Sequence, residues 1–384
     1  MREMLCAGLV IAGALVAVLL GAPAEVAAQM AANELDVVWG GTLLLTLQSD
    51  QTLNRAGGVK AFNNTYTEPE FEGFVNVGEH FSLNTLVKME QVRSVTENSA
   101  FRSEGAYVEQ LYGTVSFDPV EIYGGKIHPR FGAAWDATPG LYGTDFAEDY
   151  ELTEKIGVGG AVTADIAGRH RLAVESFFND TSFLSNSLFS RPRITDSDVL
   201  RPGRARRSDG GAGNTGSLDN FAVSLGGYNM PQLKGFSYNL GWSRQEAGAD
   251  GELNENALAA GFAWEYPLTS RITIVPMFEY AHVSHQGGAD VAADYFTVGI
   301  GAALGQGWSA SAHATVRPID DRAAGDEYTD HLAGFSVGYD LGSQLKKFSP
   351  LLDGLGIEAG YKHERAAREN LNTIGALLVY ERKF

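Results

Sequence analysis

Apolar and polar residues alternate one by one along most of this chain, and this alternation constrains the fold more than any other feature of the sequence. It is clearest in Phe236–Ser243, Tyr295–Leu304 and Trp308–Arg317. A period of two places successive side chains on opposite faces of a β-strand. Beyond the N-terminal segment no apolar run approaches the roughly 18 residues of a membrane-spanning helix. The sequence therefore predicts an all-β fold.

The same alternation predicts about 16 strands. Besides the three segments above, we expect strands at Val37–Leu47, Phe71–Val77, Phe81–Met89, Leu172–Phe178, Phe221–Leu225, Leu258–Tyr266, Ile272–Tyr280, Ala333–Leu341 and Leu355–Tyr361, with weaker patterns at Glu104–Phe117, Val120–Ile127, Lys155–Ile166 and Asn372–Phe384.

The links between these strands also alternate, short with long. The short links are Gly78–His80, Asp118–Pro119, Ala167–Arg169, Pro231–Lys234, Pro267–Ser270, Gly305–Gly307 and the somewhat longer Gly342–Asp353. The long links fall near 49–67, 94–102, 128–153, 180–218, 247–253, 286–291, 318–328 and 365–371. Short turns on one rim and long loops on the other are typical of a transmembrane antiparallel β-barrel with periplasmic turns and extracellular loops. A soluble β-sandwich, the alternative, has no reason to separate its links in this way.

The first 28 residues form a predicted export signal. Arg2 precedes the apolar run Leu5–Leu20, and small residues lead to a cleavage pattern ending at Ala27 or Ala28. An N-terminal membrane anchor is the alternative, but the apolar run is shorter than the roughly 20 residues that span a bilayer. We therefore expect residues 1–28 to be cleaved and residues 29–384 to form the barrel.

Composition and motifs argue against several other functions. The formal net charge of −18 is unsuited to a nucleic-acid binder. Cys6 is the only cysteine, which excludes a disulfide framework and a cysteine-rich zinc site. His282 and His285 would lie on opposite faces of a strand, so they make a poor metal pair. We expect no enzyme activity, no cofactor and no metal.

The C-terminal strand carries a second signal. Leu378, Tyr380 and Phe384 share one face of the last predicted strand. This resembles the closing strand of Gram-negative outer-membrane proteins, whose terminal aromatic residue is recognised by the barrel-assembly machinery. Arg382 departs from the apolar residue usual on that face. The resemblance makes Tyr380 and Phe384 the expected assembly signal.

A barrel of about 16 strands leaves an aqueous lumen, so charged residues are expected on the inward strand faces. The candidates are Glu70, Glu72, Lys88, Glu90, Glu121 or Lys126, Arg171, Glu175, Arg271, Glu279, Arg317, Glu358, Lys362, Glu381 and Lys383. These charges could hydrate the lumen or form a track for a specific solute.

The link 128–153 is the most informative segment. Its position after the fifth strand resembles the loop that folds into the lumen of general porins and forms their constriction. It contains one cation against five acids, and these are the candidate selectivity residues: Arg130, Asp136, Asp145, Glu148, Asp149 and Glu151. Acidic side chains around a constriction favour cations. The alternatives are a loop packed on the rim or a surface Ca²⁺ site.

The link 180–218 carries six arginines, Arg191, Arg193, Arg201, Arg204, Arg206 and Arg207, against four aspartates. It could capture anions or lipopolysaccharide phosphates, although its Gly-rich end favours a mobile loop. Gly125-Lys126 and Phe131-Gly132 weakly resemble phosphate-selective porins. The acidic link that follows argues against carrying phosphate selectivity over.

The mature chain thus resembles the general porins of Gram-negative outer membranes in strand plan, loop plan and terminal aromatic residue. The resemblance implies passive diffusion of small hydrophilic solutes, here with cation preference, and a homotrimer in contact with outer-membrane lipid and lipopolysaccharide. The alternatives are a substrate-specific channel for sugars, organic acids or metal chelates, and a non-conducting structural or adhesive barrel.

Overall fold

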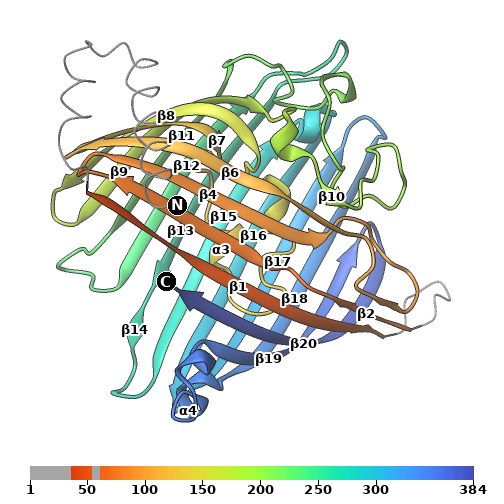
Figure 1. The fold of residues 1–384 in the computed structure, drawn as a ribbon. Coiled ribbons are helices and arrows are strands. Elements are labelled where there is room, and N and C mark those ends of the chain that lie inside the picture. The colour runs from red at the N-terminus through yellow and green to blue at the C-terminus, as the bar shows by residue number, and fades with distance from the viewer. Residues whose placement is uncertain (1–35, 54–60) are drawn as a thin grey trace.

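The structure is a computed structural model that describes residues 36–53 and 61–384 (Figure 1). The expected signal segment, 1–28, lies outside the described residues. Twenty strands form one sheet, and sixteen of them form a closed antiparallel wall. No helix among the described residues is both long enough and apolar enough to cross a membrane. The predicted all-β barrel of about 16 strands is confirmed.

The wall strands are β1 (Val37–Thr52), β3 (Glu70–Val77), β4 (Phe81–Gln91), β6 (Glu104–Phe117), β7 (Val120–Ile127), β8 (Lys155–Asp165), β9 (Arg169–Asn179), β11 (Asn220–Tyr228), β12 (Phe236–Gln245), β13 (Glu255–Trp264), β15 (Thr273–Ser284), β16 (Val291–Gly305), β17 (Trp308–Asp321), β18 (Asp326–Asp340), β19 (Leu355–Ala366) and β20 (Glu369–Lys383). Four short strands accompany the loops: β2 (Phe62–Tyr66), β5 (Ser99–Ala100), β10 (Leu188–Phe189) and β14 (Tyr266–Pro267). The short helices are α3 (Ala134–Ala137), η1 (Ala147–Tyr150), η2 (Phe183–Ser185), η3 (Arg207–Asp209), η4 (Gln286–Gly288), α4 (Gly342–Leu345) and η5 (Pro350–Leu352).

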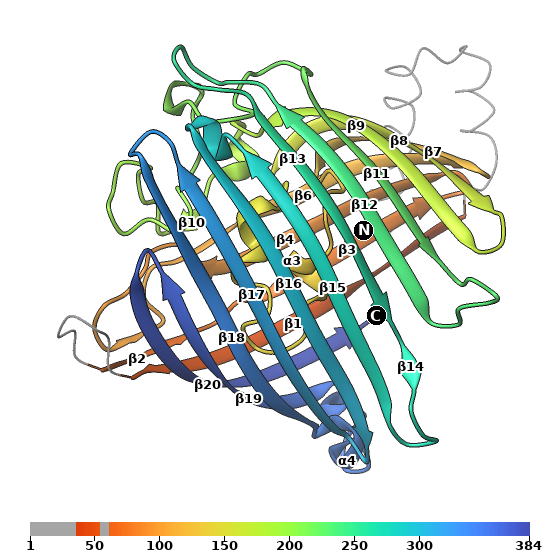
Figure 2. The same cartoon turned by 180° about the vertical axis from the view of Figure 1, so that it is seen from behind.

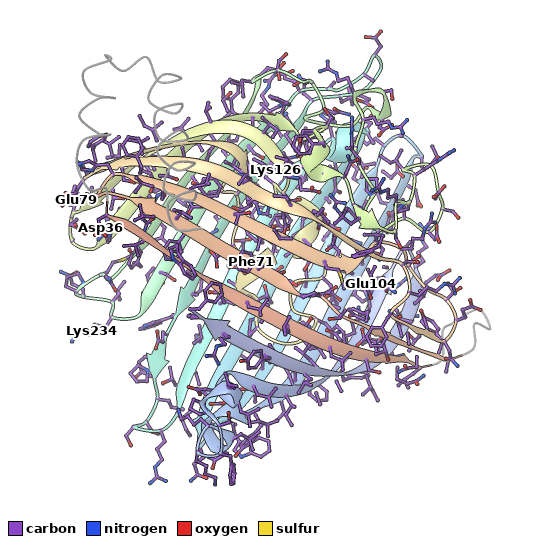
Figure 3. The ribbon with its side chains drawn as sticks, in the orientation of Figure 1. Asp36, Phe71, Glu79, Glu104, Lys126 and Lys234 are labelled. Atoms are coloured by element: carbon purple, nitrogen blue, oxygen red, sulfur yellow. The ribbon has the colours of Figure 1, made fainter. Side chains whose placement is uncertain are left out.

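The first and last strands close the barrel. β1 pairs with β3 near its start and with β20 along most of its length. The backbone of Phe384 exchanges hydrogen bonds of 3.1 and 3.2 Å with Gly41. The Phe384 ring stacks on Phe71 at 6.0 Å and lies 6.2 Å from the ring of Trp39. Figure 3 shows Phe71 on the front of the wall, close to where the chain ends in Figure 1.

The outer face of the wall is apolar and the inner face is polar, which is the reverse of the arrangement in a soluble protein. On β9, Leu172 and Val174 are 47% and 50% exposed, whereas Ala173 and Glu175 are 0% and 1% exposed. Large apolar side chains thus point outward and polar ones inward, where other parts of the chain cover them. An outward apolar band is the surface that a barrel presents to hydrocarbon.

The short links gather on one rim and the long loops on the other (Figures 1 and 2). The link that carries α4 and η5 is the most elaborate on the short-link rim. The buried apolar core lies inside the barrel: Phe131, Ala134, Tyr150 and other residues of 128–154 pack on inward residues of the wall such as Phe177. The segment between β7 and β8 therefore forms the inner layer of the fold.

Candidate functional site

The segment 128–154, which we call the lumen loop, lies inside the barrel. Its helix α3 lies within the ring of strands in both views (Figures 1 and 2). Tyr150 packs edge-on against Phe131 of the loop at 6.1 Å and against Tyr295 of β16 at 4.9 Å. These aromatic contacts fix the loop to the inner face of the wall.

One carboxylate holds both ends of the lumen loop. Glu279 of β15, 1% exposed, accepts hydrogen bonds from the backbone N–H groups of Ala133 (2.8 Å) and Ala134 (3.0 Å). It also accepts from the hydroxyl of Tyr150 (2.7 Å) and from the amide of Asn239 on β12 (2.6 Å). Four donors satisfy this buried carboxylate, so the loop is tied to the wall at this point.

Two of the acids predicted to set selectivity form ion pairs with the wall. Asp145 lies 2.6 Å from the ammonium of Lys362 on β19. Asp149 forms an ion pair with Arg317 of β17, which also binds Asp330 at 2.7 Å. Burial raises the pKa of Asp145 and of Asp149, and the cations beside them oppose that shift. These two acids anchor the loop, and their charges are largely neutralised.

The tip of the loop reaches the far side of the barrel. The hydroxyl of Tyr142 donates a 2.7 Å hydrogen bond to Asp50 of β1, and the backbone carbonyl of Pro139 lies 3.1 Å from Nδ1 of His313 on β17. From its start at the end of β7, the loop therefore crosses the lumen.

Two further acids of the loop lie near charged residues of β4 and β6. Glu148 and Glu151 lie within electrostatic range of Lys88 on β4, whose ammonium is 3.6 Å from both Glu70 and Glu90. Six carboxylates surround this single ammonium group, and we call the set the acidic ring: Glu68, Glu70, Glu90, Glu109, Glu148 and Glu151 around Lys88.

Burial and mutual repulsion hold one member of the acidic ring partly protonated near neutral pH. Burial, followed by the charge of Glu109, raises the pKa of Glu151 to about 8. His128 lies between these two carboxylates, 3.8 Å from Glu109 and 3.9 Å from Glu151. Burial lowers the pKa of His128 to about 4, so its ring adds no positive charge at pH 7.

Glu109 was not among the residues predicted from the sequence, and a β-bulge is the reason. Leu86 pairs with Gln110 and Val87 with Val108, so Glu109 is an extra residue on β6. A bulge interrupts strict alternation, so a period of two assigns residues beside the bulge to the wrong face of the strand. The consecutive polar residues Glu109 and Gln110 were the only sign of it in the sequence.

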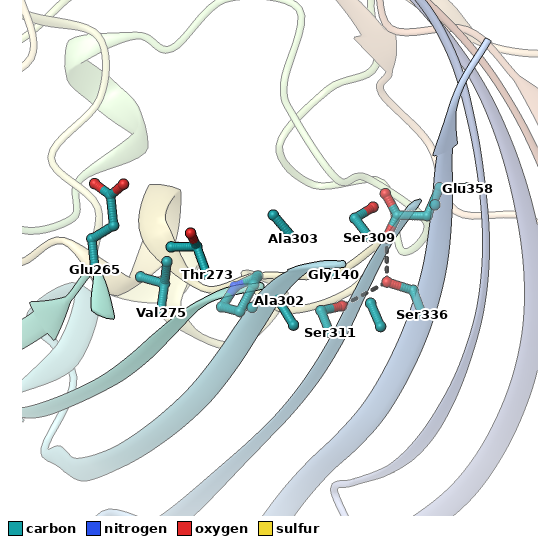
Figure 4. A pocket seen from close by; sticks show the side chains of 14 residues that line it. Gly140, Glu265, Thr273, Val275, Ala302, Ala303, Ser309, Ser311, Ser336 and Glu358 are labelled. Carbon is teal, nitrogen blue, oxygen red and sulfur yellow. Dashed lines mark hydrogen bonds between the residues drawn. The ribbon is translucent and has the colours of Figure 1, made fainter. Parts of the chain in front are cut away.

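Two cavities lie between the lumen loop and the wall, toward the short-link rim. One of about 630 Å³, which we call the Arg130 cavity, adjoins β3, β6, β7, β9, β11 and β12. The other, of about 510 Å³, is lined by small apolar residues together with hydroxyl groups and two carboxylates. In it, Ser336 hydrogen-bonds to Ser311 at 2.7 Å and to Glu358 (Figure 4).

The remaining predicted lumen residues occupy different environments. Arg171 lines the Arg130 cavity and pairs with Glu121 at 2.6 Å. Glu175 lines the same cavity and accepts a 2.6 Å hydrogen bond from Tyr123. Arg271 is not on a strand: it lies exposed in the short link before β15.

The two predicted assembly residues lie near the end of the chain. Phe384 takes part in the closure already described, and the hydroxyl of Tyr380 donates to the carbonyl of Leu351 at 2.8 Å.

The loop 180–218 is fixed to the barrel at its base. Arg201 lies 3.3 Å from the ring centre of Tyr107 and 2.7 Å from Glu154 at the end of the lumen loop. Lys126, labelled in Figure 3, has a fully buried side chain 2.8 Å from Glu154 and 3.0 Å from Asp180. Of the six arginines, Arg201 is therefore structural, whereas Arg191, Arg193, Arg204, Arg206 and Arg207 are exposed.

Within the described ranges, no group of three or more His, Cys, Asp or Glu side chains is arranged to hold a metal ion.

Comparison with known proteins gives likenesses of fold only. The chain matches no protein-family profile and no curated protein. Among solved structures it is similar to OccAB3 of Acinetobacter baumannii, with a TM-score of 0.53 and 12% identity over 90% of this chain and 99% of that one. It is similar to the outer membrane channel DcaP of the same organism, with a TM-score of 0.55 and 10% identity over 91% and 97%. It is also similar to an anion-selective porin of Comamonas acidovorans, with a TM-score of 0.51 and 10% identity over 91% and 100%.

These likenesses cover almost the whole length of each chain, so the barrel shares the architecture of outer-membrane channels. The resemblance to general porins seen in the sequence is confirmed at the level of the fold. The weaker resemblance to phosphate-selective porins stays a prediction.

Proposed function

We propose that this chain is an outer-membrane channel through which small hydrophilic solutes diffuse passively, with a preference for cations. The observation that supports it best is the lumen loop, which crosses the barrel and leaves Glu148 and Glu151 facing Lys88. A loop that narrows a hydrated lumen sets which solutes pass by width and by electric field.

The mechanism needs no catalytic group and no cofactor. The charged carboxylates of the acidic ring outnumber its one ammonium group. They attract cations into the narrow part of the lumen and repel anions, because the field of fixed charges is weakly screened in a confined space. A permeating ion exchanges part of its hydration for these carboxylates and leaves on the other side, where the two cavities adjoin the loop.

A substrate-specific channel is the second candidate, and the Arg130 cavity favours it. This cavity carries both signs of charge and three aromatic rings, from Tyr112, Tyr123 and Trp135. Cleavage of residues 1–28, the assembly role of the C-terminal residues, a homotrimer and contacts with lipopolysaccharide remain predictions from the sequence.

The test is a planar bilayer recording of purified, refolded protein under a salt gradient. We expect discrete conductance steps and a cation-selective reversal potential, which moves toward zero in Glu148→Gln/Glu151→Gln. Glu265→Gln, an exposed carboxylate that lines the other cavity, is the matched control and should change the potential less. A reversal potential that shows anion preference would contradict the proposed cation selectivity. No conductance from protein shown to be folded would contradict the proposal that the chain is a channel.

A further inference from the structure

The Arg130 cavity lies directly beyond the acidic ring. Asp136 of the lumen loop lines the cavity and also lies within electrostatic range of Glu151. On the wall of the barrel, Glu72 of β3 also lines the cavity. Glu72 is two residues from Glu70 of the acidic ring, so both side chains lie on the same face of β3. The cavity therefore adjoins the acidic ring.

Charged side chains in the cavity divide into a paired set and an unpaired set. Arg171 and Glu121 neutralise each other at 2.6 Å. By contrast, the side chains of Arg130, Glu72 and Asp136 have no hydrogen bond or ion pair within the part of the chain that the structure describes, and all three are exposed toward the lumen side. The unpaired charges are thus one guanidinium and two carboxylates.

A fourth group points to a missing donor. Glu175 is 1% exposed and lines the cavity; its Oε1 accepts from Tyr123, but its Oε2 is buried and has no partner. A buried carboxylate oxygen without a donor is costly unless a donor reaches it. The cavity therefore offers more acceptors for cationic groups than its own residues satisfy.

We propose that the Arg130 cavity is a transit site for a dibasic amino acid, a solute with one carboxylate and two ammonium groups. Arg130 takes the carboxylate, because guanidinium binds it with two parallel hydrogen bonds. Glu72 and Asp136 take the ammonium groups, and Tyr112 and Trp135 cover the aliphatic stem. The inference rests on the proposed function, since the solute reaches the cavity only through an open lumen.

The volume of the cavity and the sign of its charge both fit such a solute. About 630 Å³ exceeds the volume of a ten-atom amino acid, so water can enter with it. The charges of Arg130, Glu72 and Asp136 sum to −1, which a net charge of +1 on the solute complements. A site in a channel must bind weakly enough to release its solute.

The test is a tryptophan fluorescence titration of the refolded barrel in detergent, with Trp135 as the reporter. L-Lysine is the probe, and cadaverine, the same skeleton without the carboxylate, is its matched control. We expect saturable binding of lysine and about tenfold weaker binding of cadaverine, as one charge-assisted interaction predicts. Trp135→Phe identifies the reporting indole, and calorimetric titration measures the same affinities without it.

Variants then separate the two halves of the site. Arg130→Gln should weaken lysine about tenfold and leave cadaverine unchanged, whereas Glu72→Gln/Asp136→Asn should weaken both. Arg204→Gln, an exposed arginine of the loop 180–218, should change neither. Equal binding of the two probes, or an Arg130→Gln variant without effect, would overturn the proposal. Conducting channels that bind no lysine would overturn it while sparing the proposed function, and absent conductance would overturn both.

Discussion

The hydroxyl of Tyr150 donates a 2.7 Å hydrogen bond to the carboxylate of Glu279, across 129 residues of sequence. The same carboxylate binds the backbone of Ala133 and Ala134 near the start of the lumen loop. One side chain of the wall thus holds the beginning and the end of the loop together, and its removal should release both.

Glu279→Ala should loosen the lumen loop and destabilise the barrel. The substitution leaves buried amide and hydroxyl donors without an acceptor, at a cost of about 2–4 kcal/mol. We expect a lower thermal midpoint and noisier single-channel currents. Glu265→Ala, an exposed carboxylate, is the control. Quiet currents of normal size from Glu279→Ala would contradict this role of Glu279.

Asp145→Asn and Lys362→Met should each increase fluctuations of the open-channel current. Lys362→Met leaves Asp145 without its partner at 2.6 Å, and Asp145→Asn leaves Lys362 only its pair with Glu364 at 3.1 Å, so in both variants the loop loses its ion pair with β19. The exchanged pair Asp145→Lys/Lys362→Asp restores opposite charges and should recover quiet currents. If the exchange behaves like the single variants, the pair does not position the loop.

Cation preference should rise with pH around pH 8. The pKa of Glu151 is raised to about 8, so its carboxyl is neutral well below that pH and charged above it. A group with a raised pKa favours the folded state below its ordinary pKa, and this contribution disappears as pH rises through 8. Reversal potentials from pH 6.5 to 9.5 measure the change, which Glu151→Gln should abolish. The same slope in that variant would assign the titration to another group.

Arg201→Lys should free the base of the loop 180–218 despite keeping the charge. The guanidinium both stacks on Tyr107 and donates two hydrogen bonds to Glu154, at 2.7 and 3.0 Å, and an ammonium cannot do both. We expect faster proteolysis within 190–216 while the barrel stays folded. Arg204→Lys, the control, should be cleaved at the same rate as the unmodified protein. If Arg201→Lys is cleaved at that rate too, a positive charge at position 201 is enough to hold the base of the loop.

Phe384→Ala should lower the yield of folded barrel. The ring contacts Phe71 and Trp39 where the last strand meets the first, and the substitution removes this aromatic packing. Heat-resistant mobility in gel electrophoresis measures the folded fraction. Phe348→Ala, which removes a 77% exposed aromatic side chain from the link between β18 and β19, is the control. Equal folded fractions for the two variants would show that the Phe384 ring is not needed for closing the barrel.

Strict alternation was enough to predict the barrel, because each wall strand has one outward apolar face. It located Glu175 and Glu279 on inward faces, and link lengths located the lumen loop. Alternation failed at Arg271, because the strand begins at Thr273 and leaves Arg271 in the short link, and at Glu109, where a bulge adds a residue.

The division of the loop acids into anchors and ring members could not be predicted from the sequence. Asp145 and Glu148 belong to the same short acidic segment, yet one pairs with Lys362 and the other faces Lys88. These partners are far away in sequence, and only the path of the loop across the lumen decides which acid meets which. The composition of the loop was enough to predict its net charge, but it did not predict which of its acids are paired with the wall.

The anchors of the lumen loop come almost entirely from later parts of the chain: Glu279, Tyr295, His313, Arg317 and Lys362. A barrel whose strands are added in chain order thus passes through a stage with the loop already made but nothing for it to bind. The narrow passage is completed only when the final strands arrive. In that order of assembly, the wide barrel forms before the loop is held across it.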